Sequence, residues 1–284
     1  MSQSQPIRAS FTSMASVARR GIVVILVLVL AGTGIYFGAR YLWSVVQKST
    51  QADSCRVGAF VVDPDQAAVA STMVGVALQR GLPERAAVLA LAAGLQESKL
   101  RNIAAGSGDR DSVGVLQQRP SQGWGTEEQL NDVHYATGAF LDALVKVTNW
   151  QTRPLTEAVQ AVQISAIPEG YARHEPEAQA LADALTGKTP AGITCSFRAP
   201  TQVASTKAIA TSVTNDLPVH SPTTTDRTVS VPGASWATAA WFVANADRLG
   251  IDEVGYAART WKRGHGWRTS HAPSDAVVAT VHQT

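Results

Sequence analysis

The sequence predicts a mainly α fold class: one N-terminal transmembrane helix, an exported helical domain and a small α+β C-terminal module. Residues 21–39 form an uncharged apolar run, residues 63–187 carry repeated helix signals, and residues 198–233 turn to Ser, Thr, Pro and Val. The expected parts are a cytoplasmic tail at 1–20, a membrane anchor at 21–46, the main domain at 47–197, a linker at 198–233 and a Trp-rich module at 234–284. We expect the module to fold separately from the main domain.

The predicted anchor fixes the expected location. Its 19 uncharged residues would span about 28 Å as a helix, close to the thickness of a bilayer. The first 20 residues contain Arg8, Arg19 and Arg20 and no acid, so the positive-inside rule keeps the N-terminus cytoplasmic and exports the rest. A cleaved signal peptide is the alternative; the length of the run and the lack of a clear Ala-x-Ala site favour a single-pass membrane protein.

Charge and composition narrow the classes of partner. Residues 1–50 hold five of the 24 basic residues and no acid, which leaves 19 basic against 22 acidic residues in the exported part. This balance does not predict a nucleic-acid-binding surface. With 45% hydrophobic residues the exported part is long enough for one good core and a smaller module.

The two cysteines, Cys55 and Cys195, bracket the main domain at its two ends. In an oxidising compartment we expect a disulfide between them; two buried free thiols are the alternative. Neither cysteine has a Cys or His neighbour at zinc spacing, and the six histidines are scattered. We therefore predict no metal site and no cofactor.

Local signals place the elements of the exported part. Asp63-Pro64 supplies a cap and first turn for a helix ending near Gly81, Pro83 opens the next helix, and Thr126-x-x-Gln129 is a capping-box pattern. The remaining expected elements are a strand at 57–62, helices at 133–147, 155–165, 169–185 and 235–249, a hairpin at 254–261 and 267–270, and a strand at 276–281.

Glu97 is the most informative residue. It lies near the end of the predicted helix at 83–99, which is apolar or small on nearly every face from Ala86 to Leu95. Loss of water and the negative end of the helix dipole both raise the pKa of a carboxyl group, so such an acid can hold a proton near neutrality and give it to a glycosidic oxygen. The alternative is a Glu97 exposed on the last turn beside Lys99 and Arg101.

Three segments then follow an order that resembles the lytic transglycosylases of the lysozyme-like superfamily. Residues 97–102 (ESKLRN) resemble the Glu-Ser-x-x-x-Asn signature, and residues 112–117 (SVGVLQ) resemble Ser-x-Gly-Leu-Met-Gln. Residues 161–166 (AVQISA) occupy the place of Ala-Tyr-Asn-x-Gly, with Val162, Gln163 and Ser165 at the positions of Tyr, Asn and Gly. Over residues 63–187 the resemblance implies an α+β lysozyme-like domain. More closely, the chain resembles membrane-anchored lysozyme-like proteins of actinobacteria.

The resemblance implies an enzyme that cleaves cell-wall peptidoglycan, with Glu97 as its acid and base. It also implies substrate contacts from Ser112 and Gln117, with Gln163 in the third signature; for Ser112 and Gln117 the alternative is to hold a turn. Trp124 is expected either to form the floor of a sugar subsite or to anchor its loop. Tyr171 is expected either to point its hydroxyl at Glu97 or to pack in the core.

Asp109 and Asp111, in the segment GSGDRDS, are candidates for a second carboxylate. One of them at about 6.5 to 9.5 Å from Glu97 would indicate an inverting muramidase. Without it, the resemblance favours attack by the substrate's own N-acetyl group and a 1,6-anhydro product. We expect the structural alternative, in which the short acids cap turns.

The sequence therefore predicts a protein that acts on peptidoglycan glycan strands. A wall-binding module without turnover and an assembly protein of an envelope complex are the alternatives, and protein partners remain unspecified. The C-terminal tryptophans, Trp236, Trp241, Trp261 and Trp267, fit either a small core or saccharide binding, of which the core is the expected role.

Overall fold

The computed structural model describes residues 33–41, 52–107, 110–164, 168–270 and 275–283. The chain divides into two compact units, Met1–Ala52 and Asp53–Thr284. In the first unit residues 33–41 are helical, and the rest of the expected anchor at 21–46 lies outside the described residues. Among the residues that are described, no helix combines the length and the apolarity needed to cross a membrane.

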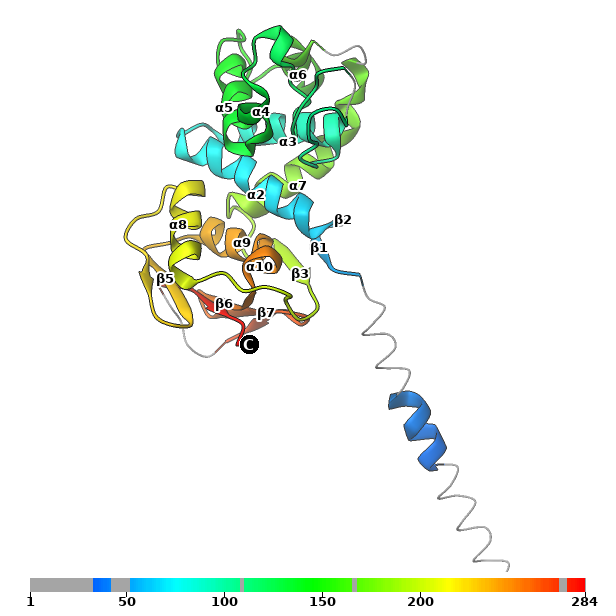
Figure 1. The fold of residues 1–284 in the computed structure, drawn as a ribbon, viewed down its shortest axis with the longest axis vertical. Coiled ribbons are helices and arrows are strands. Elements are labelled where there is room, and N and C mark those ends of the chain that lie inside the picture. The colour runs from blue at the N-terminus through cyan, green and yellow to red at the C-terminus, as the bar shows by residue number, and fades with distance from the viewer. Residues whose placement is uncertain (1–32, 42–51, 108–109, 165–167, 271–274, 284) are drawn as a thin grey trace, which may run out of the picture. The chain divides into compact units, whose positions relative to one another are not determined.

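The N-terminal half of the second unit is mostly helical (Figure 1). Helix α3 lies at its centre: the residues from Ala86 to Leu95 are all buried, and α2, α5, α6 and α7 pack around them. A helix that is apolar on every face requires such surroundings. The elements of this half are β1 (Ser54–Val57), β2 (Phe60–Val62), α2 (Pro64–Gln79), α3 (Glu84–Ser98), α4 (Glu127–Asn131), α5 (Val133–Leu144), α6 (Leu155–Gln163), α7 (Glu175–Leu185) and the short turns η1 (Pro120–Gln122), η2 (Pro168–Gly170) and η3 (Ala172–His174).

The helix starts follow the local sequence. Asp63 and Gln66 form a capping box at the start of α2, and Thr126 and Gln129 form another at α4. Each box pairs two backbone N–H groups that the helix itself leaves without a partner. These two predicted starts are confirmed.

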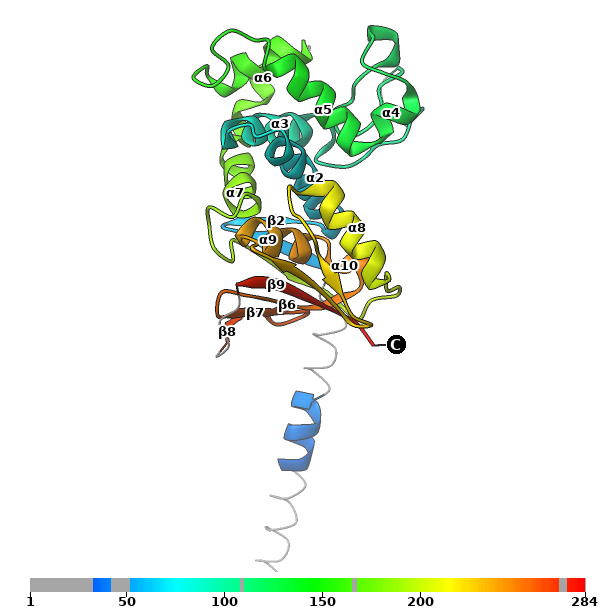
Figure 2. The same ribbon diagram turned by 90° about the vertical axis from the view of Figure 1, so that its left-hand side faces the viewer.

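The C-terminal half contains a six-stranded antiparallel sheet in the order β4-β5-β9-β6-β7-β8. Figure 2 shows α9 and α10 over one side of this sheet. A second sheet, in the order β2-β1-β3, pairs β1 and β2 at the start of the helical half with β3, the first strand of the C-terminal half. The elements here are β3 (Ile193–Ser196), α8 (Thr206–Asp216), β4 (Thr223–Thr224), β5 (Thr228–Pro232), α9 (Trp236–Ala244), α10 (Ala246–Leu249), β6 (Ile251–Tyr256), β7 (Arg259–Lys262), β8 (Gly266–Thr269) and β9 (Ala276–Val281).

These sheets correct the predicted fold class. About 47% of the described residues are helical and 17% lie in strands, which form two sheets, so the mainly α class is wrong; the same residues include no membrane-spanning helix. Much of the difference comes from residues 198–233. Their Thr, Ser and Val residues are compatible with a linker, but β-branched side chains also favour strands, and here they form β4 and β5 beside β9.

The segment expected to be a linker also contains α8, which packs on α2. The contact is close at Gly75, where an added Cβ would lie 2.2 Å from the backbone oxygen of Asp216. Ser205 caps α8 by accepting a hydrogen bond from the N–H of Ala208. This segment is therefore folded onto the helical half.

Helix α9 connects the two halves. Every residue from Ala237 to Ala244 is buried, and the helix contacts α2 and α7 on one side and β6 and β9 on the other. One continuous hydrophobic core extends from Cys55 to Val281. The structure thus differs from the expected separate module, because α9 supplies core to both halves.

The C-terminal tryptophans serve this packing. Trp241 and Trp261 are buried, and Trp236 makes edge contacts with the rings of Tyr256 and Trp267. The indole N–H of Trp261 donates to the backbone oxygen of Cys195, which ties β7 to β3. The arrangement fits the expected core role.

The predicted disulfide between Cys55 and Cys195 is confirmed. The two residues are direct partners in the antiparallel pair of β1 and β3 and lie 140 positions apart in the chain. A cross-link over a loop of this length stabilises the folded state by roughly 5 kcal/mol in the chain-entropy model. It ties the start of the helical half to β3, the strand that follows α7.

A buried polar joint also connects the halves. The carboxylate of Asp216 in α8 accepts hydrogen bonds from Thr72 Oγ1 (3.1 Å), Trp241 Nε1 (2.7 Å) and His134 Nε2 (2.8 Å). The bond to Asp216 raises the pKa of His134, while His134, Trp241 and Thr72 outweigh burial and lower the pKa of Asp216. The joint therefore holds an ion pair when His134 is protonated.

Deleting Ala234–Thr284 should abolish cooperative folding, because the deletion uncovers the faces of α2 and α7 that α9 buries. Thermal unfolding followed by near-ultraviolet circular dichroism measures this. Removing residues 1–52, a separate compact unit, is the matched control and should leave the melting temperature nearly unchanged. A melting temperature within about 5 °C of the full chain after the C-terminal deletion would show that the halves fold separately.

His134→Gln should destabilise the protein most at acidic pH. The pKa of His134 is raised in the folded state, so its contribution is complete below the unfolded pKa of about 6.5 and is lost as the pH rises through the folded value. Urea unfolding at about pH 5.5 and about pH 8.5 should give a larger loss of unfolding free energy at the lower pH. His265→Gln, which alters an exposed ring bonded to a backbone oxygen, is the control. An equal loss at both pH values would exclude the ion pair.

Candidate active site around Glu97

Glu97 lies on the last turn of α3 and lines a cleft of about 880 Å³. The walls come from the end of α3, the loop between residues 110 and 124 (the cleft loop), and the end of α6. Of the predicted site residues, the structure brings five to this cleft: Glu97, Ser112, Gln117, Trp124 and Gln163. The segments that resembled family signatures thus meet at one place.

The surroundings of Glu97 shift the pKa of its carboxyl group in opposite directions. Burial raises the pKa of the Glu97 carboxyl group, and hydrogen bonds from Tyr171 and Gln163 partly offset that rise. The Tyr171 hydroxyl donates to Glu97 Oε1 at 2.6 Å from a fully buried ring. The net pKa lies above the ordinary value because desolvation is the larger effect.

Tyr171 therefore points its hydroxyl at Glu97, which was one of the two roles expected from the sequence. Its ring also belongs to the core, so the residue fixes the position of the carboxyl group. Gln163 also supports the cleft loop, because its Nε2 donates to the backbone oxygen of Leu116 at 3.0 Å. This bond ties the end of α6 to the loop.

The cleft loop is held to α3 by the signature residues themselves. The buried Ser98 hydroxyl donates to the backbone oxygen of Val115 at 2.7 Å. Gly114 has φ +77°, and a Cβ there would lie 2.1 Å from the backbone oxygen of Leu130, so only glycine fits. The Ser of the first signature and the Gly of the second thus have structural causes that are independent of any substrate.

Other signature residues combine a turn role with a position at or near the cleft. Gln117 has φ +49°, and its Nε2 donates to the backbone oxygen of Gly114 at 2.9 Å. Asn102 donates to the backbone oxygen of Asn131 at 2.7 Å and lies outside the cleft. Ser112 is buried at the cleft wall, and Trp124 is partly buried there against the core.

Asp111 lies outside the set of residues that line the cleft. Its carboxylate accepts hydrogen bonds from the backbone N–H of Ser121 at 2.9 Å and from Arg119. These bonds hold the pKa of Asp111 well below its ordinary value, and Ser121 makes the larger contribution. This geometry fits the turn-capping alternative, while Asp109 lies outside the described residues.

Sequence reasoning missed several polar cleft residues. Gln118 is buried, its Nε2 donates to the backbone oxygen of Ala136 at 3.3 Å, and its Oε1 has no hydrogen-bond partner among the described residues. The available signal was the polar run Gln117-Gln118-Arg119, which begins at the last residue of the second signature. The further cleft residues that were missed are Gln96, Arg110, Leu116, Arg119, Gln122, Val162 and Ile164.

The charge pattern of the cleft is simple. Among the described residues that line it, Glu97 is the only acid, and Arg110 and Arg119 are the only basic residues. The other polar groups are mainly amides and hydroxyls, which bind uncharged polar substrates by hydrogen bonds. One protonatable acid in such a wall suits acid–base chemistry on a polyhydroxylated substrate.

Comparison with known protein families and with curated proteins finds no match for this chain.

Tyr171→Phe should raise the pKa of Glu97 further, because it removes a donor that stabilises the carboxylate. Carboxyl-carbon NMR over a pH titration measures both values, and Glu97→Gln identifies the resonance. Glu177, another carboxyl group whose pKa is raised by burial, serves as an internal control that should not move. A Glu97 pKa that falls or stays constant in Tyr171→Phe would show that the hydroxyl does not stabilise the charged form.

Proposed function

We propose that this protein cleaves glycosidic bonds in peptidoglycan, with Glu97 as general acid and then general base. The observation that carries the proposal is a carboxyl group of raised pKa, oriented by Tyr171, in a polar cleft that holds no other acid among its described residues. The cleft volume, about 880 Å³, suits a ligand of several linked rings.

The chemistry follows from the single acid. Glu97 gives its proton to the glycosidic oxygen as the bond from that oxygen to the anomeric carbon breaks. The N-acetyl oxygen of the same sugar attacks the anomeric carbon. Glu97, now a carboxylate, then takes the proton of the sugar's 6-hydroxyl as its oxygen displaces the acetamido oxygen, and a 1,6-anhydro sugar leaves. Water in place of the 6-hydroxyl would give hydrolysis.

The cleft residues have roles consistent with this route. The Ser112 hydroxyl and the Gln117 amide are available as contacts for acetamido and hydroxyl groups of the sugars, and Trp124 offers a ring face. Arg110 and Arg119 also line the cleft, and Arg119 is paired with Asp111. The amides, the hydroxyl and the indole ring favour an acylated, polyhydroxylated glycan.

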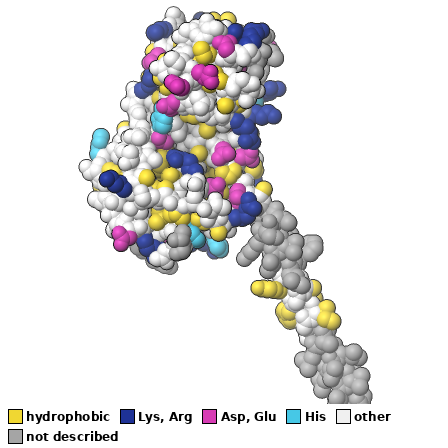
Figure 3. All heavy atoms as spheres, viewed as in Figure 1, with side chains coloured by type: hydrophobic (Ala, Val, Ile, Leu, Met, Phe, Trp, Pro, Cys, Tyr) yellow, Lys and Arg dark blue, Asp and Glu magenta, His cyan; other side chains and the backbone are white. Residues whose placement is uncertain are grey.

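The disulfide supports an extracytoplasmic location, where a peptidoglycan substrate would be met. Disulfides persist in oxidising compartments and are rare in the cytosol. On the face drawn in Figure 3, the coloured acidic and basic side chains are intermixed. A surface of mixed charge favours a substrate recognised in a cleft over a polyanion bound along one face.

A binding module without turnover is the second candidate, and one observation favours it. Tyr171 and Gln163 both donate to Glu97, and such donors stabilise the carboxylate that cannot protonate a leaving group. A protein of this kind would hold a glycan strand in the same cleft without releasing products.

Glu97→Gln should lower the release of soluble fragments from purified peptidoglycan by at least about 100-fold, because the amide keeps the size of the acid but has no proton to give. Mass spectrometry of the digest measures the fragments and identifies the product: anhydro ends indicate the internal route, and reducing ends indicate hydrolysis. Glu177→Gln is the matched control, since Glu177 is also a carboxyl group whose pKa is raised by burial but lies outside the cleft.

Fragment release within about threefold of the wild type for Glu97→Gln would remove Glu97 as the acid. Peptidoglycan that co-sediments equally with wild type and Glu97→Gln, with no fragments from either, would favour the binding module.

A further inference from the structure

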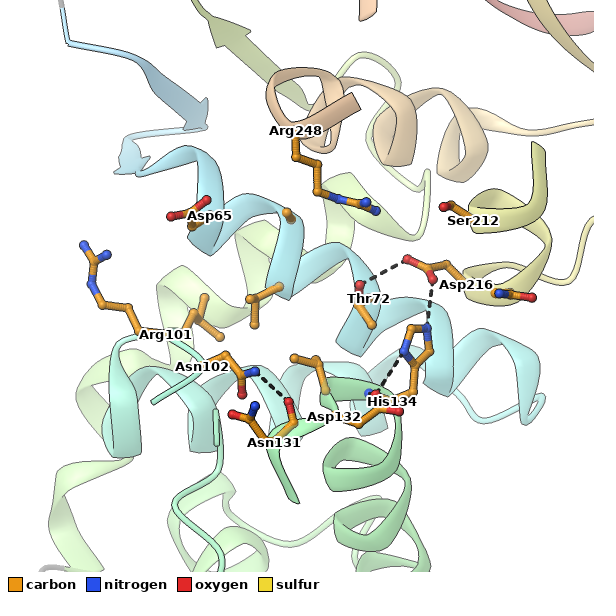
Figure 4. A pocket seen from close by; sticks show the side chains of 15 residues that line it. Asp65, Thr72, Arg101, Asn102, Asn131, Asp132, His134, Ser212, Asp216 and Arg248 are labelled. Carbon is orange, nitrogen blue, oxygen red and sulfur yellow. Dashed lines mark hydrogen bonds and ion pairs between the residues drawn. The ribbon is translucent and has the colours of Figure 1, made fainter. Parts of the chain in front are cut away.

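A second cavity, of about 710 Å³, lies at the junction of the two halves and is separate from the Glu97 cleft. Helix α2 and the loops around Asn102 and Asp132 line it from one half, and α8 and α10 line it from the other (Figure 4). Its size falls in the range of small-ligand sites. Nothing in the proposed glycan chemistry uses it.

One face of α2 forms the floor of this cavity. Asp65, Ala68, Val69 and Thr72 all line it and are spaced at helical intervals, so they follow one stripe of the helix. At 1.5 Å per residue the stripe runs for about 10 Å from Asp65 to Thr72. It begins with a carboxylate, continues with two apolar side chains and ends at the His134–Asp216 joint.

Arg248 of α10 makes the end of the cavity near Thr72 cationic. Its Nε donates to Oδ1 of the buried Asn245 at 2.6 Å, and its guanidinium carbon lies 5.8 Å from the ring centre of Trp241. These contacts fix the direction of the side chain. Among the described residues, no hydrogen bond is made by the two terminal nitrogens, which Figure 4 shows directed toward Ser212 and Asp216.

Asp216 does not fully compensate this cation. Its oxygens already accept from Thr72, Trp241 and His134. Loss of water lowers the pKa of the Arg248 guanidinium, and the charge of Asp216 opposes that shift only in part. Ser212, one turn before Asp216 on α8, adds a hydroxyl to the same wall. Arg248 is exposed to solvent, and a ligand anion between Arg248 and Ser212 would add a charge-assisted pair to the contacts that hold the side chain.

The far end of the floor has the opposite character. Asp65 lies in the first turn of α2, and its carboxylate makes no hydrogen bond or ion pair among the described residues. Arg101, the basic residue near it in Figure 4, is paired with Asp63. Asn102 uses its amide N–H on the backbone oxygen of Asn131, which leaves its side-chain oxygen as an acceptor.

We propose that this cavity binds a short peptide of about three residues that ends in a free carboxylate, held by Arg248 and Ser212. An extended chain covers about 3.3 Å per residue, so three residues match the 10 Å floor. The apolar middle suits small side chains, and Asn side chains along the wall suit peptide groups. The described lining contains no Phe, Tyr or Trp ring, which disfavours a sugar.

The peptide has two sources of the same chemistry. A free peptide would place its ammonium group at Asp65, whereas a peptide attached through its amino end to a larger molecule would leave Asp65 without a charged partner. Trialanine, acetyl-trialanine and trialanine amide, each titrated into the purified full chain by calorimetry, separate these cases.

Wild type should bind trialanine at least about 10-fold more tightly than trialanine amide, since only the acid offers Arg248 a charge-assisted pair. Arg248→Gln should weaken trialanine about 10-fold and bind acid and amide alike. Arg248→Lys, which keeps the charge without the planar fork, should lie between them. Arg259→Gln, an exposed arginine of β7 outside the cavity, is the matched control and should bind as wild type does.

The comparison of trialanine with acetyl-trialanine shows whether the bound peptide is free or attached through its amino end. Weaker binding of acetyl-trialanine, with the difference removed by Asp65→Asn, indicates a free peptide; equal binding indicates a peptide acylated at its amino end. Absence of trialanine binding at about 10 mM, or equal affinity of the wild type for acid and amide, would overturn the proposal. Unchanged melting temperatures of the variants establish that any loss arises at the site.

Discussion

The structure depends on the burial of α9 on all sides. This short helix has no polar stripe, so it is stable only where other elements remove every face from water. The helical half covers one side and the six-stranded sheet covers the other. The chain continues from α9 into α10, and so the position of Arg248 follows from the same packing. The cavity between the halves is thus built on a framework that neither half provides alone.

The same physical constraint acts on Glu97 through α3. A helix surrounded by α2, α5, α6 and α7 can carry charged side chains only near its two ends. Glu97 lies near the C-terminal end, where the cleft begins. There the carboxyl group still loses enough water to raise its pKa. Tyr171 and Gln163 stabilise the charged form, and burial stabilises the neutral form. A group that must both give and take a proton benefits from being close to that balance.

How far the fold could be predicted depended on whether a signal was local. The capping boxes at Asp63 and Thr126 and the final strand at β9 need only neighbouring residues, and the sequence shows them. The segment 198–233 needs partners: its Thr and Val residues become β5 only because β9, about 50 positions later, lies beside it. Composition alone is the same for a linker and for such a strand, and for that reason the sheet was missed.

The candidate site shows the same limit at the level of side chains. Glu97, Ser112 and Gln163 meet at one cleft because the packing of their segments brings them together. The spacing of the motifs in the sequence reflects that packing. Yet a glycine is needed at position 114 because the backbone oxygen of Leu130 leaves no room for a side chain. The hydroxyl of Ser98 donates its hydrogen bond to a backbone oxygen of the cleft loop. Such a pattern identifies a loop geometry before it identifies a reaction. The proposed chemistry then rests on the carboxyl group of Glu97. This group lies against the cleft loop, but it is not one of the groups that hold the loop in place.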